Sequence, residues 1–484
     1  MLHPDDLFDR EHEWRDLHAF VAGVRPGVQL GILRGRRRQG KSFLLRRLAR
    51  SVGGLYHQAV RSQPAQALEA LGATLGAHLG VPCGQVALRD WDAALEALFK
   101  VPVPVVILDE FPYLLAHSPE LATTVQKHID AGRDSGPPVR LILCGSALSV
   151  MAQLLGGQQA LRGRAVMDLS LGPFDYRLAA RYHGIDDPAT ALRVDAVLGG
   201  TPGYRDLAPA APNAVEGLSD WLAAGVLNPS SALFREDDYL LAEEQTLTDR
   251  GLYHAVLRAV ADGATTVTQV AAALGRDKTG VGYPLRSLEA AGFISRTEDA
   301  LRRRRPIYRV ADPIVRFHHV ITRPDLARFE DRRTAEAWQD ALPRFSGQIL
   351  GPHFEHLARE FIRRHASAAM LGGAVATVGP AVINDARARR THELDVVVHG
   401  RAEDGGAPLL AIGEAKHTSR QRGLADLRRL EHIRGLLESA GHRAASDARL
   451  LLFSAAGFDA DLATEVGRRA DAAMIDLDQM YHLH

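Results

Sequence analysis

The sequence predicts an α/β protein with a parallel sheet near its start and a second α/β unit at its end. Short apolar runs at 30–33, 103–108 and 139–144 alternate with segments of helical spacing, which is the pattern of parallel strands joined by helices. Two later runs, 393–398 and 409–416, are separated by a turn containing Gly400, Gly405 and Gly406, which suits a hairpin.

The composition is that of an ordinary globular chain. It has 484 residues, 46% hydrophobic and 24% charged, and this length predicts about three domains. Its 58 basic and 58 acidic residues cancel, so any binding to nucleic acid or a membrane surface must be local. Cys83 and Cys144 are far apart and indicate no disulfide framework. Because no signal-peptide pattern or membrane-length apolar stretch is found, we expect a cytoplasmic protein without a membrane partner.

The most specific motif lies between the first strand and the helix that follows it. It reads Gly35-Arg36-Arg37-Arg38-Gln39-Gly40-Lys41-Ser42, and Phe43 comes next. This satisfies the phosphate-binding pattern of Gly, four residues, Gly, Lys and Ser or Thr. Backbone N–H groups of such a loop turn toward phosphates, Lys41 reaches the β- and γ-phosphates, and Ser42 offers its hydroxyl to Mg²⁺. The sequence therefore predicts a site for a nucleotide and Mg²⁺.

Two carboxylates follow the second apolar strand and predict a hydrolytic site. Asp109 is expected to hold Mg²⁺ through water, and Glu110 to orient and deprotonate the attacking water. Ser146 follows the third strand, where a sensor of the γ-phosphate would lie. Arg164 is a candidate arginine finger, in its own subunit or a neighbour, although a solvated arginine at a helix end explains it equally well.

Three more motifs flank these sites. They read Phe8-Asp9-Arg10-Glu11, Gly163-Arg164 and Gly199-Gly200-Thr201-Pro202. In this order the motifs resemble the archaeal-type P-loop ATPases, in the STAND branch of the AAA+ superfamily. The resemblance covers residues 8–204 and implies that the nucleotide is ATP and that Lys41 and Glu110 are catalytic. Several members of this family also carry a winged helix and a nuclease-like C-terminal domain.

The segment 247–312 resembles a winged helix. It reads as three helices, the second opened by the capping box Thr266 to Gln269, and then two strands around Arg302-Arg303-Arg304-Arg305. The arginines can grip phosphates while the third helix enters a major groove. The alternative is a solvated wing in a domain that packs on the ATPase as a relay.

The last region carries a second set of charged residues. Glu414 and Lys416 are two apart on one strand and so share a face, and a suitable register brings Asp395 beside them. With Glu355 on the preceding helix, these four residues resemble the PD-(D/E)xK nuclease fold. The resemblance implies that Glu355, Asp395 and Glu414 hold Mg²⁺ and that Lys416 orients water or stabilises the phosphate. The alternatives are an exposed hairpin with a surface salt bridge, and a domain that has lost cleavage but kept binding.

These observations divide the chain into five parts and predict a function for it. The parts are a P-loop ATPase domain at 1–205, a helical lid or connector at 206–246, a winged helix at 247–320, a helical connector at 321–344, and a PD-(D/E)xK, restriction-endonuclease-like domain at 345–484. We expect an ATP-hydrolysing switch that controls a Mg²⁺-dependent nuclease-like domain acting on nucleic acid, and that forms a nucleotide-dependent homo-oligomer. The alternatives are a nucleotide-regulated signalling or scaffold protein and a DNA-binding regulator whose C-terminal domain does not cleave.

Overall fold

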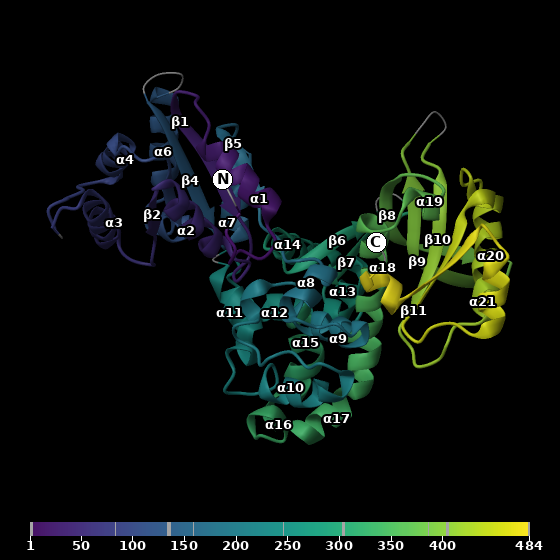
Figure 1. Cartoon of the computed structure of the whole chain (residues 1–484). Coiled ribbons are helices and arrows are strands. Elements are labelled where there is room, and N and C mark those ends of the chain that lie inside the picture. The colour runs from purple at the N-terminus through teal and green to yellow at the C-terminus, as the bar shows by residue number, and fades with distance from the viewer. Residues whose placement is uncertain are drawn as a thin grey trace.

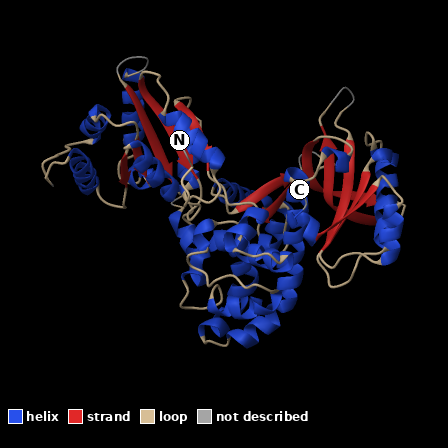
Figure 2. Ribbon diagram, in the orientation of Figure 1, coloured by secondary structure: helices blue, strands red, loops and turns tan. Residues whose placement is uncertain are grey.

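The computed structural model describes residues 3–82, 84–132, 137–157, 159–244, 246–302, 305–385, 387–402 and 406–482. Four residues named above, Cys83, Arg303, Arg304 and Gly405, lie outside these ranges. The two larger sheets lie apart, and the helices of the middle of the chain lie between and below them in the view of Figure 1. Figure 2 shows the same arrangement, with the strands of the two sheets in red and the helical middle in blue.

The first sheet is a five-stranded parallel sheet in the order β2-β3-β4-β1-β5. The bounds are β1 Gly27–Arg34, β2 Leu55–Gln58, β3 Val106–Asp109, β4 Pro138–Gly145 and β5 Ala165–Ser170. The three predicted strands are thus confirmed as β1, β3 and β4. Because β1 lies between β4 and β5, the loop that leaves its carboxyl end sits near the middle of the sheet edge.

Helices cover both faces of this sheet because its strands are apolar on both sides. The apolar residues of α1 (Glu11–Val21) and α2 (Lys41–Val52) pack in one cluster with Ile107 and Ile142. On the other face, a second cluster joins Leu30 and Leu108 to three further helices. These are α3 (Pro64–Leu79), α4 (Trp91–Lys100) and α6 (Leu121–Ala131). Two shorter helices, α5 (Phe111–Leu115) and α7 (Leu148–Leu155), follow β3 and β4.

The middle of the chain is helical apart from one small hairpin. Its first helices are α8 (Tyr176–His183), α9 (Pro188–Leu198), α10 (Leu218–Ala224) and α11 (Glu236–Glu243). The winged helix follows as α12 (Arg250–Ala261), α13 (Val267–Ala273), α14 (Lys278–Ala290), β6 (Ile294–Glu298) and β7 (Pro306–Val310). The predicted capping box is present, since the Thr266 side chain accepts from the Gln269 backbone and the Gln269 side chain accepts from the Thr266 backbone.

A run of short helices then leads to the C-terminal unit. It comprises α15 (Pro313–Phe317), a π-helical turn η4 (His318–Thr322), α16 (Leu326–Glu330), α17 (Thr334–Arg344), a second π-helical turn η6 (Phe345–Leu350) and α18 (Gly351–Arg364). The end of the chain returns to this middle region, where the Tyr176 hydroxyl donates to the Met480 carbonyl at 2.6 Å. One buried apolar cluster therefore runs from the helical middle into the C-terminal unit.

The C-terminal sheet is mixed, in the order β12-β11-β10-β9-β8. Its strands are β8 (Val375–Asp385), β9 (Arg390–Gly400), β10 (Leu409–Lys416), β11 (Arg449–Ser454) and β12 (Ala472–Asp476). The first three pair antiparallel and the last three pair parallel. Apolar residues of α18 pack with one face, through Val396 and Ala411. Those of α20 (Leu424–Ser439) and α21 (Ala460–Gly467) pack with the other, through Val397 and Ile412.

None of the described helices combines the length and the apolar character that a membrane crossing requires.

Candidate functional sites: the P-loop and the C-terminal carboxylates

The phosphate-binding motif forms the loop between β1 and the N-terminus of α2. Gly40 caps α2 with a φ of 88°, a left-handed conformation that glycine adopts at no steric cost. A Cβ on Gly35 would lie 2.4 Å from the Leu171 carbonyl oxygen, so this position also requires glycine. The loop therefore has the tight backbone and the helix N-terminus that phosphate binding needs.

Lys41 lies inside this loop. Its side chain is buried, and Nζ donates to the Arg36 carbonyl oxygen at 2.9 Å. The Arg36 amide donates to Gln39 Oε1 at 2.8 Å, so the loop is closed by its own residues. Ser42, half-buried, is the second residue of α2. The ammonium, the hydroxyl and the glycine-shaped loop fit the phosphates of a nucleotide and a Mg²⁺ ion. Phe43, next in the chain, is exposed, and the Arg47 guanidinium lies 4.9 Å from its ring centre.

Asp109 ends β3 and is fully buried. Its Oδ2 accepts a hydrogen bond from the Tyr56 hydroxyl at 2.6 Å, and its Oδ1 accepts from the Glu110 amide at 2.9 Å. Burial, followed by the charge of Asp109, raises the pKa of Tyr56, so its phenol stays protonated and donates. Asp109 is thus oriented by neutral donors that leave its negative charge available to a cation. Tyr56 was not identified from the sequence, because its contact with Asp109 depends on the pairing of β2 with β3.

Glu110 stands in a left-handed backbone conformation, with a φ of 54°. Non-glycine residues pay about 1–3 kcal/mol for such conformations, which gather at functional sites. Its Oε2 accepts from the Ser146 hydroxyl at 3.0 Å, because β3 and β4 are neighbours and end side by side. The structure therefore brings together the two residues predicted as the base and the γ-phosphate sensor.

The three arginines of the loop direct their side chains away from it. Arg36 pairs with Asp312 at 2.9 Å, donates to the Gly292 carbonyl at 3.2 Å, and lies 4.5 Å from the centre of the Phe293 ring. All three partners border the strands of the winged helix. The side chain of Arg36 thus joins the loop to the winged helix. Only the backbone of Arg36 is left to contact the predicted nucleotide.

Arg37 and Arg38 contact α11 instead. Arg37 pairs with Glu243. Arg38 makes a bidentate pair with the buried Glu236, with N–O distances of 2.7 and 3.0 Å. The Arg38 carbonyl also accepts from the Gly203 amide at 2.9 Å, so the Gly-Gly-Thr-Pro turn packs against the loop as well. The P-loop is therefore tied to α11 through two ion pairs and to the Gly-Gly-Thr-Pro turn through one backbone hydrogen bond.

Arg164 lies at the other end of the sheet. It precedes β5, which runs parallel to β1, so it is at the edge opposite the P-loop. Its guanidinium pairs with Asp130 through two hydrogen bonds of 2.9 and 2.7 Å. The prediction that Arg164 contacts the nucleotide of its own subunit is therefore wrong for this conformation. A contact with a neighbouring subunit stays a prediction.

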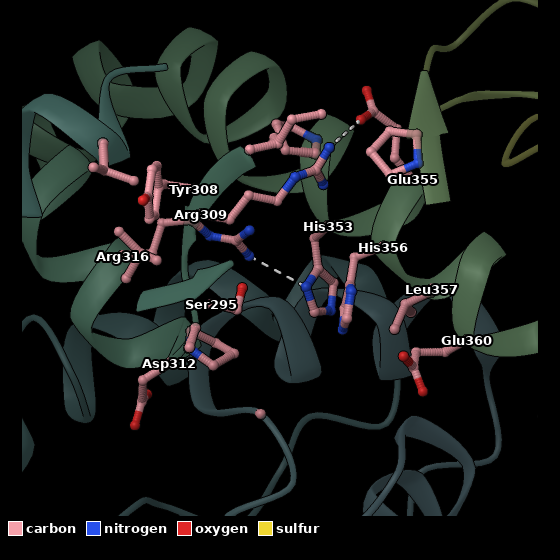
Figure 3. A pocket seen from close by; sticks show the side chains of 18 of the residues that line it. Ser295, Tyr308, Arg309, Asp312, Arg316, His353, Glu355, His356, Leu357 and Glu360 are labelled. Atoms are coloured by element: carbon pink, nitrogen blue, oxygen red, sulfur yellow. Dashed lines mark hydrogen bonds and ion pairs between the residues drawn. The ribbon is translucent and has the colours of Figure 1, made fainter. Parts of the chain in front are cut away.

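In the C-terminal unit, Asp395 and Glu355 face the winged helix. Arg309, on β7, lies 3.5 Å from Glu355 Oε2 (Figure 3). Asp395 is buried and its Oδ2 accepts from the Ala415 amide at 2.8 Å. Burial, with the charge of Glu355 as the next cause, raises the pKa of Asp395 to about 6. The structure thus places Asp395 within electrostatic range of Glu355, and it places an arginine of the winged helix on that glutamate.

Glu414 is almost fully buried and surrounded by cations. Its Oε1 lies 3.0 Å from Lys416 Nζ and accepts from Arg429 at 2.9 Å, and its Oε2 accepts from Arg422 at 3.3 Å. Carboxylates are suitable ligands for Mg²⁺. In this conformation, however, the charge of Glu414 is balanced by three side chains of the protein itself. Asp395 and Glu414 lie on the neighbouring antiparallel strands β9 and β10, one position beyond the Val396 and Gly413 pair, as the predicted register requires.

A cavity of about 730 Å³ connects these regions. Its walls include Arg36, Arg309, Asp312, Glu355 and Asp395, so it extends from the P-loop to the C-terminal carboxylates. Figure 3 shows the part where α18 faces the winged helix. There a second chain of contacts is formed by Arg316, which donates to His353 Nδ1 at 3.2 Å, and by His353 Nε2, which donates to Asp195 at 2.7 Å.

The wing is docked on the C-terminal sheet. The Ala300 amide donates to the Pro380 carbonyl at 2.9 Å, and Asp299 Oδ2 accepts from the Val382 amide at 3.3 Å. Ala300 and Leu301 also pack against the apolar cluster of the C-terminal unit. The prediction of a solvated wing is therefore wrong for these residues, because the wing is covered by β8.

Comparison with known proteins supports the winged-helix assignment. Residues 246–305 match the MarR family. The chain is 23% identical over 360 residues to the uncharacterized protein MJECL04 of Methanocaldococcus jannaschii, an alignment that covers 73% of this chain and 76% of that protein.

Three solved structures match parts of the chain at low identity. The Walker-type ATPase PABY2304 of Pyrococcus abyssi is 21% identical, with a TM-score of 0.46, and the match covers 66% of this chain and 99% of that one. The ORC2 protein of Aeropyrum pernix, solved as ADPNP and ADP complexes, is 15% identical with a TM-score of 0.41, covering 69% and 96%. The STAND protein PH0952 of Pyrococcus horikoshii, which has a tetratricopeptide repeat sensor, is 14% identical with a TM-score of 0.28, covering 75% and 50%.

Proposed function

We propose that the chain is an ATP-hydrolysing switch whose nucleotide state is relayed by the winged helix to a nuclease-like C-terminal domain acting on nucleic acid. One observation carries this proposal. Arg309 and Asp312 are close in sequence on the segment that ends the wing, and they form ion pairs with two different parts of the chain. Asp312 pairs with Arg36 of the P-loop, and Arg309 pairs with Glu355 of the nuclease-like domain. A movement of this segment would change both pairs together.

The P-loop residues have defined roles in this switch. The loop backbone and Lys41 would hold the phosphates of ATP, and Ser42 and Asp109 would hold Mg²⁺, which supplies electrostatic stabilisation of the transferred phosphoryl group. Glu110 accepts the proton of the attacking water once the Ser146 hydroxyl turns to the γ-phosphate. To reach the phosphates, Lys41 would give up its hydrogen bond to the Arg36 carbonyl. Arg36 is also the residue whose side chain pairs with Asp312.

The C-terminal carboxylates would then be released from their cations. With Arg309 on Glu355 and Lys416, Arg422 and Arg429 on Glu414, two of the three predicted Mg²⁺ ligands of this unit are already neutralised, whereas Asp395 accepts from the Ala415 amide. We therefore infer that this conformation is a restrained state, in which metal binding competes with the protein's own side chains. Movement of the winged helix would remove Arg309 first, since it comes from a different unit.

Two assays test the two halves of this proposal. For the first, ATPase rates are compared for the wild type, Lys41→Ala and Glu110→Gln, and losses of about 100-fold or more are expected for both variants. Equal rates in all three proteins would remove the ATPase. For the second, plasmid and RNA are incubated with Mn²⁺ or Mg²⁺, with and without ATP. Cleavage should be lost in Asp395→Ala, and identical digestion by that variant would mean that a contaminant cuts.

The relay itself is tested by the Arg36 to Asp312 pair. Arg36→Ala and Asp312→Ala should each uncouple nucleic acid cleavage from ATP while ATPase activity persists. The double variant should be no more uncoupled than either single variant, because both changes break one contact. Arg37→Ala serves as the matched control, since it also removes one arginine from the P-loop but breaks an ion pair with Glu243 of α11. Full ATP dependence in Arg36→Ala would contradict the relay.

A DNA-binding regulator is a second candidate, favoured by the exposed face of α14. Lys278, Tyr283 and Arg286 are exposed on this helix, with Tyr283 62% exposed, and the segment matches the MarR family. This function predicts duplex affinity that falls steeply with salt concentration and that weakens in Arg286→Ala and Arg302→Ala. Flat salt dependence would exclude it.

Gel filtration with and without nucleotide then tests the homo-oligomer, and a nucleotide-dependent size change without nucleic acid binding would favour a scaffold.

A further inference from the structure

A cluster of potential metal ligands lies in the helical middle of the chain, outside the sites described above. Asp237 comes from α11, His254 from α12 and His319 from the π-helical turn η4. One ligand atom from each lies within 4.8 Å of the others. The three residues are dispersed in sequence, so only the packing of these helices brings them together.

The polar atoms of this cluster lack hydrogen-bond partners. Asp237 and His319 are almost fully buried, and neither carboxylate oxygen of Asp237 and neither ring nitrogen of His319 is hydrogen-bonded. His318 Nε2 comes within 3.2 Å of Asp237 Oδ2 but without hydrogen-bond geometry. Buried polar atoms in folded proteins are almost always satisfied, so a group of unsatisfied atoms that face one another indicates a missing partner. An ion bound by all three residues would satisfy them together.

The surroundings of the cluster suit a cation. Asp237 and His319 are almost fully buried, and none of the ion pairs among the described residues joins Asp237 to a lysine or an arginine. Buried carboxylates are normally paired with a cation or bound to a metal, so an ion would supply the positive charge that Asp237 lacks.

A neighbouring carboxylate orients one of the ligands. His254 Nε2 lies 3.1 Å from Asp238 Oδ1, which places the proton on Nε2 and leaves the lone pair on Nδ1. His254 Nδ1 is buried and has no hydrogen-bond partner. Histidines that bind metals characteristically donate their second nitrogen to a carboxylate in this way. Asp238, which is not itself a member of the cluster, is thus a positioning residue for His254.

We propose that Asp237, His254 and His319 bind a divalent transition-metal ion, with Zn²⁺ as the best fit. Two imidazoles and one carboxylate are ligands of Zn²⁺ and its neighbours, whereas Mg²⁺ and Ca²⁺ take oxygen ligands. His318 stands next to Asp237 and is placed to be a fourth ligand. The π-helical turn that carries His318 and His319 widens the helix at this point, a feature found often at functional sites.

Helix α11 would link the bound ion to the P-loop. Asp237 follows Glu236, the buried partner of Arg38. A metal bound to Asp237 would fix the first turn of α11 against α12 of the winged helix and η4. The site would therefore hold the lid and the first helix of the winged helix in one orientation, independently of nucleotide. It does not depend on the nuclease activity proposed above.

The experiment measures Zn²⁺ bound by the untagged full-length chain. The protein is stripped with a chelator, incubated with ZnCl₂, gel-filtered and analysed for metal by mass spectrometry. The wild type should retain about one Zn²⁺ per chain, and His319→Gln and His254→Gln should each retain about tenfold less. His432→Gln is the matched control, because it removes a ligand from the second candidate cluster, Asp385, His392 and His432. It should retain as much Zn²⁺ as the wild type.

Folding is checked separately so that each outcome has one meaning. His254 is partly accessible, so His254→Gln is expected to fold, and circular dichroism verifies this for every variant. As a second readout, Zn²⁺ should raise the thermal midpoint of the wild type and of His432→Gln but not of His319→Gln. A wild type that retains no Zn²⁺ would overturn the proposal. So would loss of Zn²⁺ in His432→Gln with retention in folded His254→Gln, because the ion would then lie in the second cluster.

Discussion

The P-loop region and the C-terminal unit each carry carboxylates that we propose as metal ligands, but the partners of these carboxylates differ. Asp109 is held by a phenol and a backbone amide, which orient it without balancing its charge. Glu414 is held by a lysine and two arginines, and Glu355 by a third arginine, Arg309. Neutral donors leave a carboxylate free to bind a cation, whereas ammonium and guanidinium groups compete with one. In the function proposed above, the first site would bind Mg²⁺ without changing its partners, whereas Glu355 and Glu414 of the second would first have to exchange theirs.

The same contrast applies to the arginines of the P-loop. In the C-terminal unit the cations lie on the predicted metal ligands themselves. Around the P-loop the cations Arg36, Arg37 and Arg38 leave the site and pair with the lid and the winged helix. Basic residues therefore connect the first site to its surroundings and restrain the second. The predictions below test this difference, beginning with the largest expected effect.

The ion pair of Arg38 should contribute most to stability. Glu236 is fully buried, so Arg38→Ala leaves a buried charge without a partner, which typically costs about 3–5 kcal/mol. The hydrogen bonds to Glu236 raise the pKa of Arg38, and they outweigh burial, which lowers it. Urea denaturation followed by circular dichroism measures the loss.

Arg37→Ala is the control for this prediction. Arg37 is 43% exposed and pairs with Glu243, so its loss should change the free energy of unfolding by about 1 kcal/mol or less. Equal losses of stability in the two variants would mean that burial of Glu236 does not make the Arg38 ion pair stronger than the Arg37 ion pair. These ion pairs would then not hold the P-loop rigidly against α11.

Asp395 should oppose folding at neutral pH. Its pKa is about 6 in the folded chain, above its ordinary value of 3.8, with burial as the first cause and Glu355 as the second. The stability contributed by its protonated form is therefore full below 3.8 and is lost as the pH rises through about 6. A shift of this size corresponds to about 2–3 kcal/mol, so Asp395→Asn should stabilise the C-terminal unit by about that amount at pH 8.

Chemical denaturation at two pH values checks the sign of this effect. The variant should gain much less over the wild type at pH 4 than at pH 8, because the wild-type carboxyl is protonated at the lower pH. A gain that does not depend on pH would show that Asp395 is not strained by its charge. Burial without a cationic partner would then not distinguish Asp395 from Glu355 and Glu414, which have such partners.

Removing Arg309 should open the C-terminal site to metal. The Arg309 to Glu355 pair is partly exposed, with about a quarter of each side chain accessible, so it is worth about 1 kcal/mol. Arg309→Ala is therefore expected to strengthen Mn²⁺ binding by about three- to tenfold, measured by calorimetry or by Mn²⁺ relaxation. Arg296→Ala, on the neighbouring strand β6 and paired with Glu298, is the matched control and should leave the affinity unchanged. Weaker binding in Arg309→Ala would mean that the arginine supports the site.

The parts of this molecule that were predicted from sequence are those specified by neighbouring residues. The strands β1, β3 and β4, the P-loop and the capping box at Thr266 each depend on a short pattern, and each is present. The antiparallel β9 and β10 follow from two apolar runs that are joined by a glycine-containing turn. Local chemistry is sufficient for these elements, because backbone hydrogen bonding and periodic burial act over a few residues.

The partners of these motifs were not predicted, because they depend on tertiary packing. Arg36 contacts Gly292, which is 256 positions away, and no local pattern indicates this. The three cations on Glu414 come from β10, the following loop and α20, and Arg309 comes from another unit. Asp237, His254 and His319 have no metal-site spacing in sequence. The sequence thus indicated candidate residues for the chemistry, whereas the partners that neutralise some of these residues depend on the fold.

Arg164→Ala is the prediction with the smallest expected effect. Arg164 lies at the sheet edge opposite the P-loop, and its bidentate pair with Asp130 is largely a surface contact. Turnover of ATP per chain should therefore be unchanged, within about twofold, when the protein is dilute and monomeric. The assay is repeated at increasing protein concentration. A large loss of activity that develops only at high concentration, and that wild-type chains restore when mixed with the variant, would assign Arg164 to a neighbour's nucleotide. A large loss in the dilute protein would require β5 to reorganise when nucleotide binds.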